Sequence, residues 1–208
     1  AQGFLDASKP DDLQMLDTLV QNLGALREYD LAWQVFTGFG LRARSRNGGV
    51  ALLVDGGFET SSDHEPFAWV LSEEGDLWAA RQQAPKGREG QVLGLVAHSG
   101  RSGEVARQLV RLGPGRYQVV ATMGNVPQDA FERPELRLSC ATADVKPGQV
   151  LLILKPTFSG ESARQVSARF TVPPTCRFQW VAVAVAGGGQ QPDVVPWVDP
   201  IRLARASR

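Results

Sequence analysis

The sequence GEVARQLVRLGPGRYQVVATM at residues 103–123 decides the fold. On either side of Gly113-Pro114-Gly115, apolar and polar side chains alternate, as in Val110-Arg111-Leu112 and Tyr117-Gln118-Val119. A period of two places one face of a strand against a core and leaves the other face free. Glycine and proline together favour a tight turn. The stretch therefore predicts two antiparallel strands joined as a β-hairpin.

Short runs of the same kind continue on both sides of this stretch, and helical periodicity disappears after about residue 50. Clusters of Gly, Pro, Asp and Ser separate the runs at the spacing that is typical of an antiparallel sandwich or barrel. Parallel strands would need helical crossovers, and the sequence offers none. The predicted strands are Ala51–Val54, Phe67–Leu71, Leu77–Arg81, Val92–Ala97, Gly103–Leu112, Tyr117–Met123, Glu135–Cys140, Val150–Lys155, Gln165–Val172, Phe178–Val185 and Ile201–Ala206.

The first 40 residues follow a different pattern. Apolar side chains recur there at helical steps, at Leu13, Leu16, Leu19, Val20, Leu23 and Leu26. A shorter helix follows from Leu31 to Phe36, so the segment predicts a helical hairpin. We place the domain boundary in the basic, glycine-containing segment that follows, with the hairpin at residues 1–48 and the β-sandwich at 49–208. The hairpin is either the end of a helical-repeat array or a pair of helices packed on the sandwich.

Composition narrows the class of partner. The 208 residues hold 22 basic and 22 acidic side chains, which does not favour bulk attraction to nucleic acid or to an anionic membrane. No apolar run is long enough to span a bilayer. The opening Ala1-Gln2-Gly3 fits either a mature end after cleavage at a small residue or a shortened chain. Cys140 and Cys176 lack nearby metal-ligand partners, which leaves either two buried thiols or a disulfide.

Several segments, taken together, resemble the carbohydrate-binding jelly-roll modules of the galactose-binding-like superfamily. Leu53–Glu59 resembles their opening Asn-Gly-Asp-Phe-Glu strand, with Asp-Gly-Gly in place of Asn-Gly-Asp. The other matching segments are Pro66–Trp69, the central Arg107–Tyr117 and the closing Trp197–Leu203. The resemblance covers about residues 50–208, and its subgroup appended to helical-repeat proteins of bacterial envelopes is the most similar, through Cys176-Arg177-Phe178-Gln179-Trp180.

The resemblance implies a mainly β fold, an antiparallel jelly-roll β-sandwich preceded by the short helical hairpin. It also favours a disulfide between Cys140 and Cys176, and hence an oxidising compartment, periplasmic or extracellular. The subgroup suggests roles around exopolysaccharide assembly. Members of the superfamily bind polysaccharides or oligosaccharides, which is the expected class of partner here.

A structural calcium ion often joins the first and last strands of such modules. Carried over to this sequence, its side-chain ligands are Glu59 and Asp199. Calcium prefers six to eight oxygen ligands, which carboxylates and carbonyls supply. The alternative is that the two carboxylates cap strand ends or pair with Arg202. Pro200 and Gly57 both depart from the family pattern at these motifs.

Sugar binding needs an aromatic platform and planar hydrogen-bonding groups. Six residues are candidates: Trp78, Arg81, Arg107, Gln118, Arg137 and Gln179. Alternation along their strands places Arg107, Gln118 and Arg137 on the outward face. A row of arginine and glutamine on one sheet face would suit polar or acidic glycans. The alternative is an ordinary solvated sheet face. We assign Trp69 and Trp180 to the core.

Three functions remain open, in this order. The first is a non-catalytic carbohydrate-binding or polysaccharide-accessory module of an envelope or secreted protein. The second is a protein-interaction module that uses an apolar stripe on the hairpin at Leu16, Leu19, Leu23 and Leu26. The third is a hydrolase, which would need two facing carboxylates or a His–carboxylate pair. His64 and His98 lie in separate polar segments, so we expect no enzyme.

Overall fold

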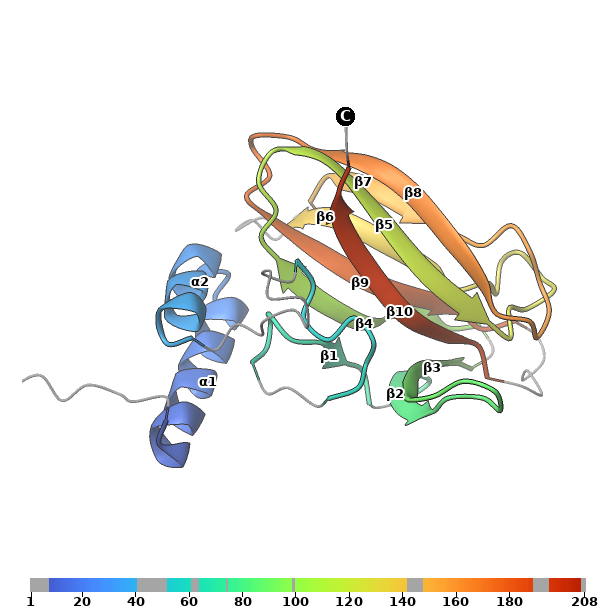
Figure 1. Cartoon of the computed structure of the whole chain (residues 1–208), viewed down its shortest axis with the longest axis horizontal. Helices are drawn as coiled ribbons and strands as arrows, with labels where there is room; N and C mark the ends of the chain where they lie inside the picture. The colour runs from blue at the N-terminus through green and yellow to red at the C-terminus, as the bar shows by residue number, and fades with distance from the viewer. Residues whose placement is uncertain are drawn as a thin grey trace, which may run out of the picture.

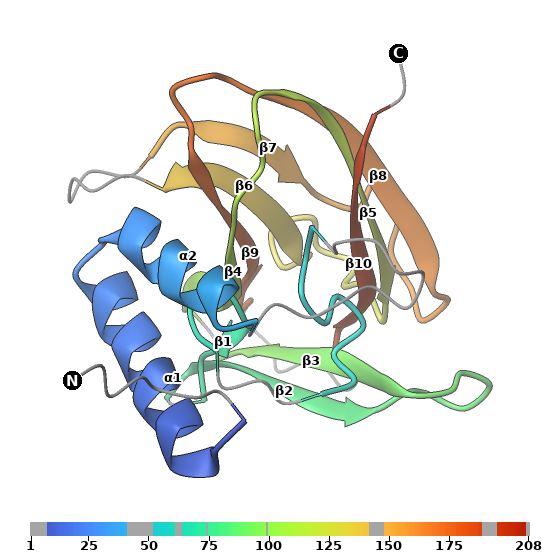
Figure 2. The ribbon, with the colours of Figure 1, turned by 60° about the vertical axis from the view of Figure 1, so that its left-hand side comes forward.

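Two antiparallel sheets of five strands each pack face to face, and two helices lie against the outside of one sheet (Figures 1 and 2). The computed structural model describes residues 8–40, 52–60, 64–73, 75–98, 100–141, 148–188 and 195–206, and the strand count refers to these residues. The predicted antiparallel β-sandwich with a short helical hairpin at its N-terminal end is confirmed.

The strand order is that of a jelly roll. One sheet has the order β1-β4-β9-β6-β7 and the other β2-β3-β10-β5-β8. From β3 onward the chain passes repeatedly between the sheets, and the first and last strands of this run, β3 and β10, pair with each other. The strands are β1 Val70–Leu71, β2 Leu77–Gln83, β3 Gln91–Ala97, β4 Ser102–Val110, β5 Gly115–Gly124, β6 Glu135–Ala141, β7 Val150–Leu154, β8 Arg164–Val172, β9 Phe178–Ala186 and β10 Trp197–Arg205.

Alternation along each strand builds the core between the sheets. On β6, Leu136, Leu138 and Cys140 are buried toward the opposite sheet, and the residues between them face outward and are half-exposed. The same alternation on β5 buries Tyr117 and Val119. Both sheets therefore contribute to one shared apolar interior, and each keeps an outer face.

The predicted β-hairpin at Gly113-Pro114-Gly115 is wrong. Strand β4 pairs with β9, whereas β5 pairs with β10 and β8, so the connection crosses from one sheet to the other. The Tyr117 hydroxyl donates to the Gly113 carbonyl at 2.9 Å within this arch. Period-two alternation cannot separate the two arrangements, because a strand buries one face whether its sequence neighbour lies beside it or opposite it.

The strand predicted at Ala51–Val54 does not form in the described residues, which begin there at Leu52. The Gln108 side chain makes the two backbone hydrogen bonds with Val54 that a neighbouring strand would otherwise make. Its Oε1 accepts from the Val54 N–H at 2.8 Å, and its Nε2 donates to the Val54 carbonyl at 2.9 Å. Asp55 then has a φ of 46°, which turns the chain away from an extended path.

The helical hairpin consists of α1 Pro10–Ala25 and α2 Tyr29–Gly38. It packs on the outer face of the sheet that contains β4 and β9. Phe36 stacks on Phe67 with ring centroids 4.7 Å apart, and Trp33 meets Phe67 edge-on at 5.2 Å. Leu109 and Phe178 of the sheet complete this apolar cluster. The domain boundary at residues 48 and 49 lies outside the described residues.

Polar contacts also hold the hairpin to the sandwich. His64 Nδ1 lies 2.5 Å from Asp17 Oδ1 of α1, and Arg177 Nη1 lies 2.7 Å from Asp30 Oδ2 at the start of α2. The two helices are thus packed against the sandwich, as one of the two interpretations requires. A continuation into a helical array stays a prediction.

Cys140 and Cys176 form a disulfide, which confirms that prediction. It joins the end of β6 to the turn before β9, across a sequence separation of 36 residues. A disulfide fits an oxidising compartment. Among the described helices, none is both long and apolar enough to cross a membrane.

Candidate functional site

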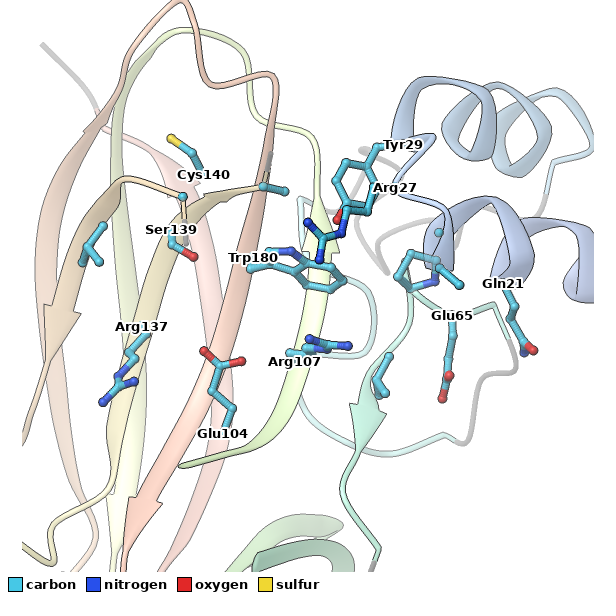
Figure 3. A pocket seen from close by; sticks show the side chains of 17 residues that line it. Gln21, Arg27, Tyr29, Glu65, Glu104, Arg107, Arg137, Ser139, Cys140 and Trp180 are labelled. Carbon is cyan, nitrogen blue, oxygen red and sulfur yellow. The ribbon is translucent and has the colours of Figure 1, made fainter. Parts of the chain in front are cut away.

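A groove of about 550 Å³ lies on the outer face of the β1-β4-β9-β6-β7 sheet, beside the helical hairpin (Figure 3). The strands supply its floor, including Arg107, Arg137, Ser139 and Trp180. The C-terminal end of α1, the turn after it and the first residue of α2 supply a wall, through Gln21, Gly24, Ala25, Arg27 and Tyr29. Glu65 and Pro66 bound the groove beside β1. Its volume is within the range of about 300–1,000 Å³ that small-ligand sites occupy.

Strand register brings the two floor arginines into one row. Ala182 of β9 pairs with Arg107 of β4 on one side and with Arg137 of β6 on the other. Because paired residues of neighbouring strands point to the same face, both guanidinium groups project outward here. The small Ala182 between them adds little height to the floor. These two residues were predicted as ligand-binding, and the structure brings them together.

Trp180 lies in the next row of the same face, between Leu109 and Ser139. The Tyr29 ring meets its edge at 6.2 Å, and the Arg107 guanidinium lies over its ring at 4.8 Å (Figure 3). Trp180 is half-buried and lines the groove, so its assignment to the sandwich core is wrong. The core assignment of Trp69, which is 3% exposed, is confirmed.

The charges of the groove differ in how far they are neutralised. Arg137 donates from Nε to Glu135 Oε1 at 2.6 Å, and Lys155 approaches the other oxygen of Glu135 at 3.8 Å. Arg107 makes no ion pair within the described parts of the chain, and its guanidinium is held by the Trp180 ring instead. Glu104, which is exposed, lines the groove on the side away from the hairpin.

The other four predicted ligand-binding residues are elsewhere. Gln179 is fully buried, so its prediction as a surface residue is wrong. Its Oε1 accepts from the Leu112 N–H at 2.8 Å, and its Nε2 donates to the Cys176 carbonyl at 2.6 Å. The carboxamide is both donor and acceptor, so it can hydrogen-bond backbone groups that lie outside the strands, after β4 and before β9.

Trp78, Arg81 and Gln118 belong to the opposite sheet and do not contact the groove. Trp78 and Arg81 of β2 line a separate hollow at the sheet edge. Arg81 Nη2 lies 3.8 Å from Asp55 Oδ2. Gln118 of β5 is half-buried and sits between Arg169 and Ala204 on the neighbouring strands. Their binding role stays a prediction, but they cannot act together with Arg107 and Arg137.

The residues around Glu59 and Asp199 do not fit the calcium ion that the resemblance implies. Arg88 Nη2 donates to the Asp199 carbonyl at 3.2 Å and to its Oδ2 at 3.3 Å. Glu59 Oε1 accepts from the Gln91 N–H at 3.3 Å. A guanidinium group thus already supplies positive charge at Asp199, and N–H groups engage the oxygens that calcium would need. No group of three or more His, Cys, Asp or Glu suited to a metal occurs among the described residues.

Two carboxylates at this end of the sandwich are perturbed. Burial raises the pKa of Asp199, against the hydrogen bond and charge of Arg88, which lower it. Burial also raises the pKa of Asp55. The hydrogen bonds that its carboxylate accepts from the N–H groups of Thr60 and Glu59 oppose this rise. Sequence reasoning missed Arg88, because it lies in a loop 111 residues away from Asp199 along the chain.

The described lining of the groove does not include the His–carboxylate pair that a hydrolase could use. His64 and Asp17 form the His–carboxylate pair noted above, but neither lines the groove. The carboxylates that line it, Glu65 and Glu104, come from the wall beside β1 and from the floor. The groove offers aromatic, guanidinium, carboxylate and hydroxyl groups, which is a set suited to hydrogen-bonding a polar ligand.

No protein family model and no curated protein matches the sequence. Among solved structures, the chain is similar to the carbohydrate-binding module TmCBM61, determined in complex with β-1,4-galactotriose. The TM-score is 0.49 and the identity 16%, over 75% of this chain and 99% of that one. It is also similar to a family 16 carbohydrate-binding module, with TM-score 0.49 and 17% identity over 74% and 99% of the two chains.

A third similar structure is the C-terminal family 22 carbohydrate-binding module of Clostridium thermocellum Xyn10B. The TM-score is 0.48 and the identity 12%, over 73% of this chain and 92% of that one. Likeness at this level transfers no ligand and no binding residue. A function for this chain has to come from the groove itself.

Proposed function

We propose that the chain binds an oligosaccharide, or a segment of a polysaccharide, in the groove between the helical hairpin and the sheet. The observation that carries the proposal is the Trp180–Arg107 pair, with the guanidinium 4.8 Å from the ring centroid on the groove floor. Arg137 and Ser139 extend this surface on β6. A rigid sheet holds all four residues, which limits the entropy lost on binding.

The chemistry of the lining supports this class of ligand. Sugars present apolar C–H faces and edges of hydroxyl groups, and they are bound by aromatic side chains together with planar hydrogen-bonding groups. The half-buried Trp180 provides aromatic surface, and the largely buried Tyr29 adds to it where its ring meets Trp180. Arg107, Arg137, Glu104 and Ser139 provide donors and acceptors around it.

A glycan array, followed by calorimetric titration of each bound glycan, tests the proposal. Trp180→Ala and Ser139→Phe are the site variants, because the first removes aromatic surface and the second fills the floor. Trp78→Ala is the matched control, since Trp78 lies on the opposite sheet. We expect both site variants to lose binding and the control to keep it. Loss of binding in Trp78→Ala alone contradicts the proposed site.

We further propose a non-catalytic, accessory role for this binding in the periplasm or outside the cell, in the handling of exopolysaccharide. The Cys140–Cys176 disulfide supports the oxidising compartment. Prolonged incubation of a bound oligosaccharide with the protein, followed by mass spectrometry, checks the catalytic point. We expect the oligosaccharide to stay intact. Cleavage that Glu104→Gln abolishes would establish an enzyme instead.

A second candidate function is a protein contact made by α1. Met15 and Leu19 on this helix and Leu26 directly after it are 58%, 40% and 72% exposed. Leu16 is buried and Leu23 is half-buried, so only part of the predicted stripe is available. Sedimentation analysis over a range of concentrations, with Leu19→Glu as the variant, tests for self-association through this face. An invariant monomer in the unmodified protein counts against it.

A further inference from the structure

We propose that the groove selects acidic oligosaccharides, and that Arg107 binds the carboxylate of a uronic acid residue. This inference rests on the proposed oligosaccharide binding and adds the class of sugar. It starts from an imbalance on the groove floor. Arg137 is neutralised by Glu135, whereas Arg107 has no carboxylate partner in the described parts of the chain.

The Arg107 guanidinium lies over the Trp180 ring, with its carbon 4.8 Å from the ring centroid. A guanidinium that lies over an aromatic face keeps its N–H groups along its own edge, and these remain available to acceptors. The planar fork of N–H groups matches the two oxygens of a carboxylate. A lysine at this position would offer a single point charge and no such match. Arg107 is exposed, so a ligand can reach it.

Glu104 decides on which side of Arg107 the carboxylate binds. Glu104 and Glu135 both pair with Ala184 of β9, so one row of the sheet face carries two carboxylates. Arg107 and Arg137 occupy the next row, and Trp180 and Ser139 the row beyond it, nearer the hairpin. Glu135 is paired with Arg137, so it is repulsion from Glu104 that favours an anionic group on the Trp180 side of Arg107.

The position beside Trp180 also suits the rest of the sugar. A uronic acid carries its carboxylate on a ring that has apolar C–H groups close by. An anion bonded to the edge of Arg107 therefore brings that ring against Trp180 and the Ser139 hydroxyl, which lie in the same row of the sheet face. One bound residue can use the guanidinium, the aromatic surface and the hydroxyl together.

The test uses acidic oligosaccharides and their methyl esters, which share backbone, linkage and length and differ in charge. Oligogalacturonates and oligoglucuronates of two to six residues serve as probes, with the corresponding neutral hexose oligomers beside them. The variants are Arg107→Gln, Arg107→Lys and Glu104→Gln. Arg169→Gln is the control, because Arg169 is exposed on β8 of the opposite sheet.

We expect at least one acidic series to bind, and its methyl ester to bind about 10- to 100-fold more weakly, the loss typical of one charge-assisted hydrogen bond. Arg107→Gln should reproduce this loss with the acid and have little effect on the ester. Arg107→Lys should recover only part of the affinity. Glu104→Gln should strengthen binding of the acid, because it removes a repelling charge.

The outcomes separate the two proposals. Equal binding of acid and ester, or preference for a neutral oligomer lost in Trp180→Ala, would overturn the acidic selectivity and leave oligosaccharide binding in place. Acid binding that Arg107→Gln does not alter would also overturn it. If none of the array glycans and none of these probes binds, the proposed function fails, and the selectivity fails with it. Circular dichroism of each variant confirms that it is folded.

Discussion

Replacing Arg88 by methionine should destabilise the sandwich in a pH-dependent way. Arg88 hydrogen-bonds the carbonyl and the carboxylate of Asp199, and its guanidinium lies over the Trp197 ring at 4.9 Å. Asp199 is 7% exposed, so the substitution leaves a buried carboxylate without its cation. Methionine keeps much of the apolar stem, which limits the loss of packing.

The magnitude follows from these contacts. A hydrogen bond to a charged group contributes about 1.5–3 kcal/mol, and a partly exposed cation–π contact about 0.5–1 kcal/mol. The Arg88 side chain is 32% exposed, so water weakens both contributions. We therefore expect a loss of about 2 kcal/mol in the free energy of unfolding near pH 7. For a chain of 208 residues this corresponds to a midpoint lower by roughly 4–8 °C.

The sign of the pH dependence follows from Asp199. Its pKa is raised above 3.8 by burial, and Arg88 opposes that rise. A carboxyl group with a raised pKa in the folded state favours folding below its ordinary pKa, and this contribution is lost as the pH rises through the folded value. Without Arg88 the folded pKa rises further, so the stability deficit of Arg88→Met grows with pH. Below about pH 4 only the part of the deficit that comes from the Trp197 ring and the Asp199 carbonyl remains.

Urea unfolding of the unmodified protein and Arg88→Met across about pH 4 to pH 8 measures this deficit. Arg88→Lys is the control, because it keeps the charge and loses the planar fork. A deficit near zero at neutral pH, or one that is constant across the range, would refute the assigned ion pair.

Four further predictions concern the rest of the molecule. Calcium and a chelator should both leave the unfolding midpoint unchanged, and a calcium-dependent rise would show that an ion binds at Glu59 and Asp199 after all. Replacing Cys140 and Cys176 by serine should lower the free energy of unfolding by about 4 kcal/mol, because the unfolded chain is no longer restricted by a loop that spans 36 residues. An unchanged urea midpoint would contradict this. Phe36→Ala should lower the free energy of unfolding by about 3–5 kcal/mol, because it leaves a cavity beside Phe67. It should also weaken oligosaccharide binding, since the helical hairpin forms a wall of the groove. Proteolysis in the hairpin should accelerate in this variant, and equal rates would argue against its docking role. Trp180→Leu should reduce oligosaccharide affinity more than stability, as titration and melting of the same sample would show; an equal loss of both would assign Trp180 to packing alone.

The sequence was sufficient to predict an antiparallel β-sandwich, because alternation shows which face of each strand is buried. Val110 and Leu112 point to the core as their alternation predicts, and Arg107 projects outward. The pairing partners were not predictable in the same way. The segments around Gly113 would show the same pattern as a hairpin or as an arch, and only packing between the sheets selects the arch.

The candidate site was predicted in part, and the failures have identifiable causes. Strand β9 is apolar almost throughout, so its outward residue Trp180 resembled a core residue. The branched Val181, Val183 and Val185 alternate there with small alanines. That contrast is the signal that could have shown which residues of β9 face the core and which face outward. Gln179 was misplaced because a glutamine facing inward is bound by backbone groups that the sequence does not identify.

The wall of the groove was not predictable from the helical hairpin or the sandwich alone. It comes from Arg27 and Tyr29 at the junction of α1 and α2, and these reach the sheet only because the hairpin docks on Phe67 and Phe178. Alternation and helical periodicity describe each element separately. Contacts between distant elements depend on tertiary packing.

Amide chemical shifts recorded during titration with an oligosaccharide taken from the array test the binding site most directly. We expect shift changes at residues of β4, β6 and β9 that line the groove, and at the C-terminal end of α1. We expect no comparable changes around Trp78 and Gln118. Changes confined to the opposite sheet, or spread evenly over the surface, would contradict a binding site between the hairpin and the sheet.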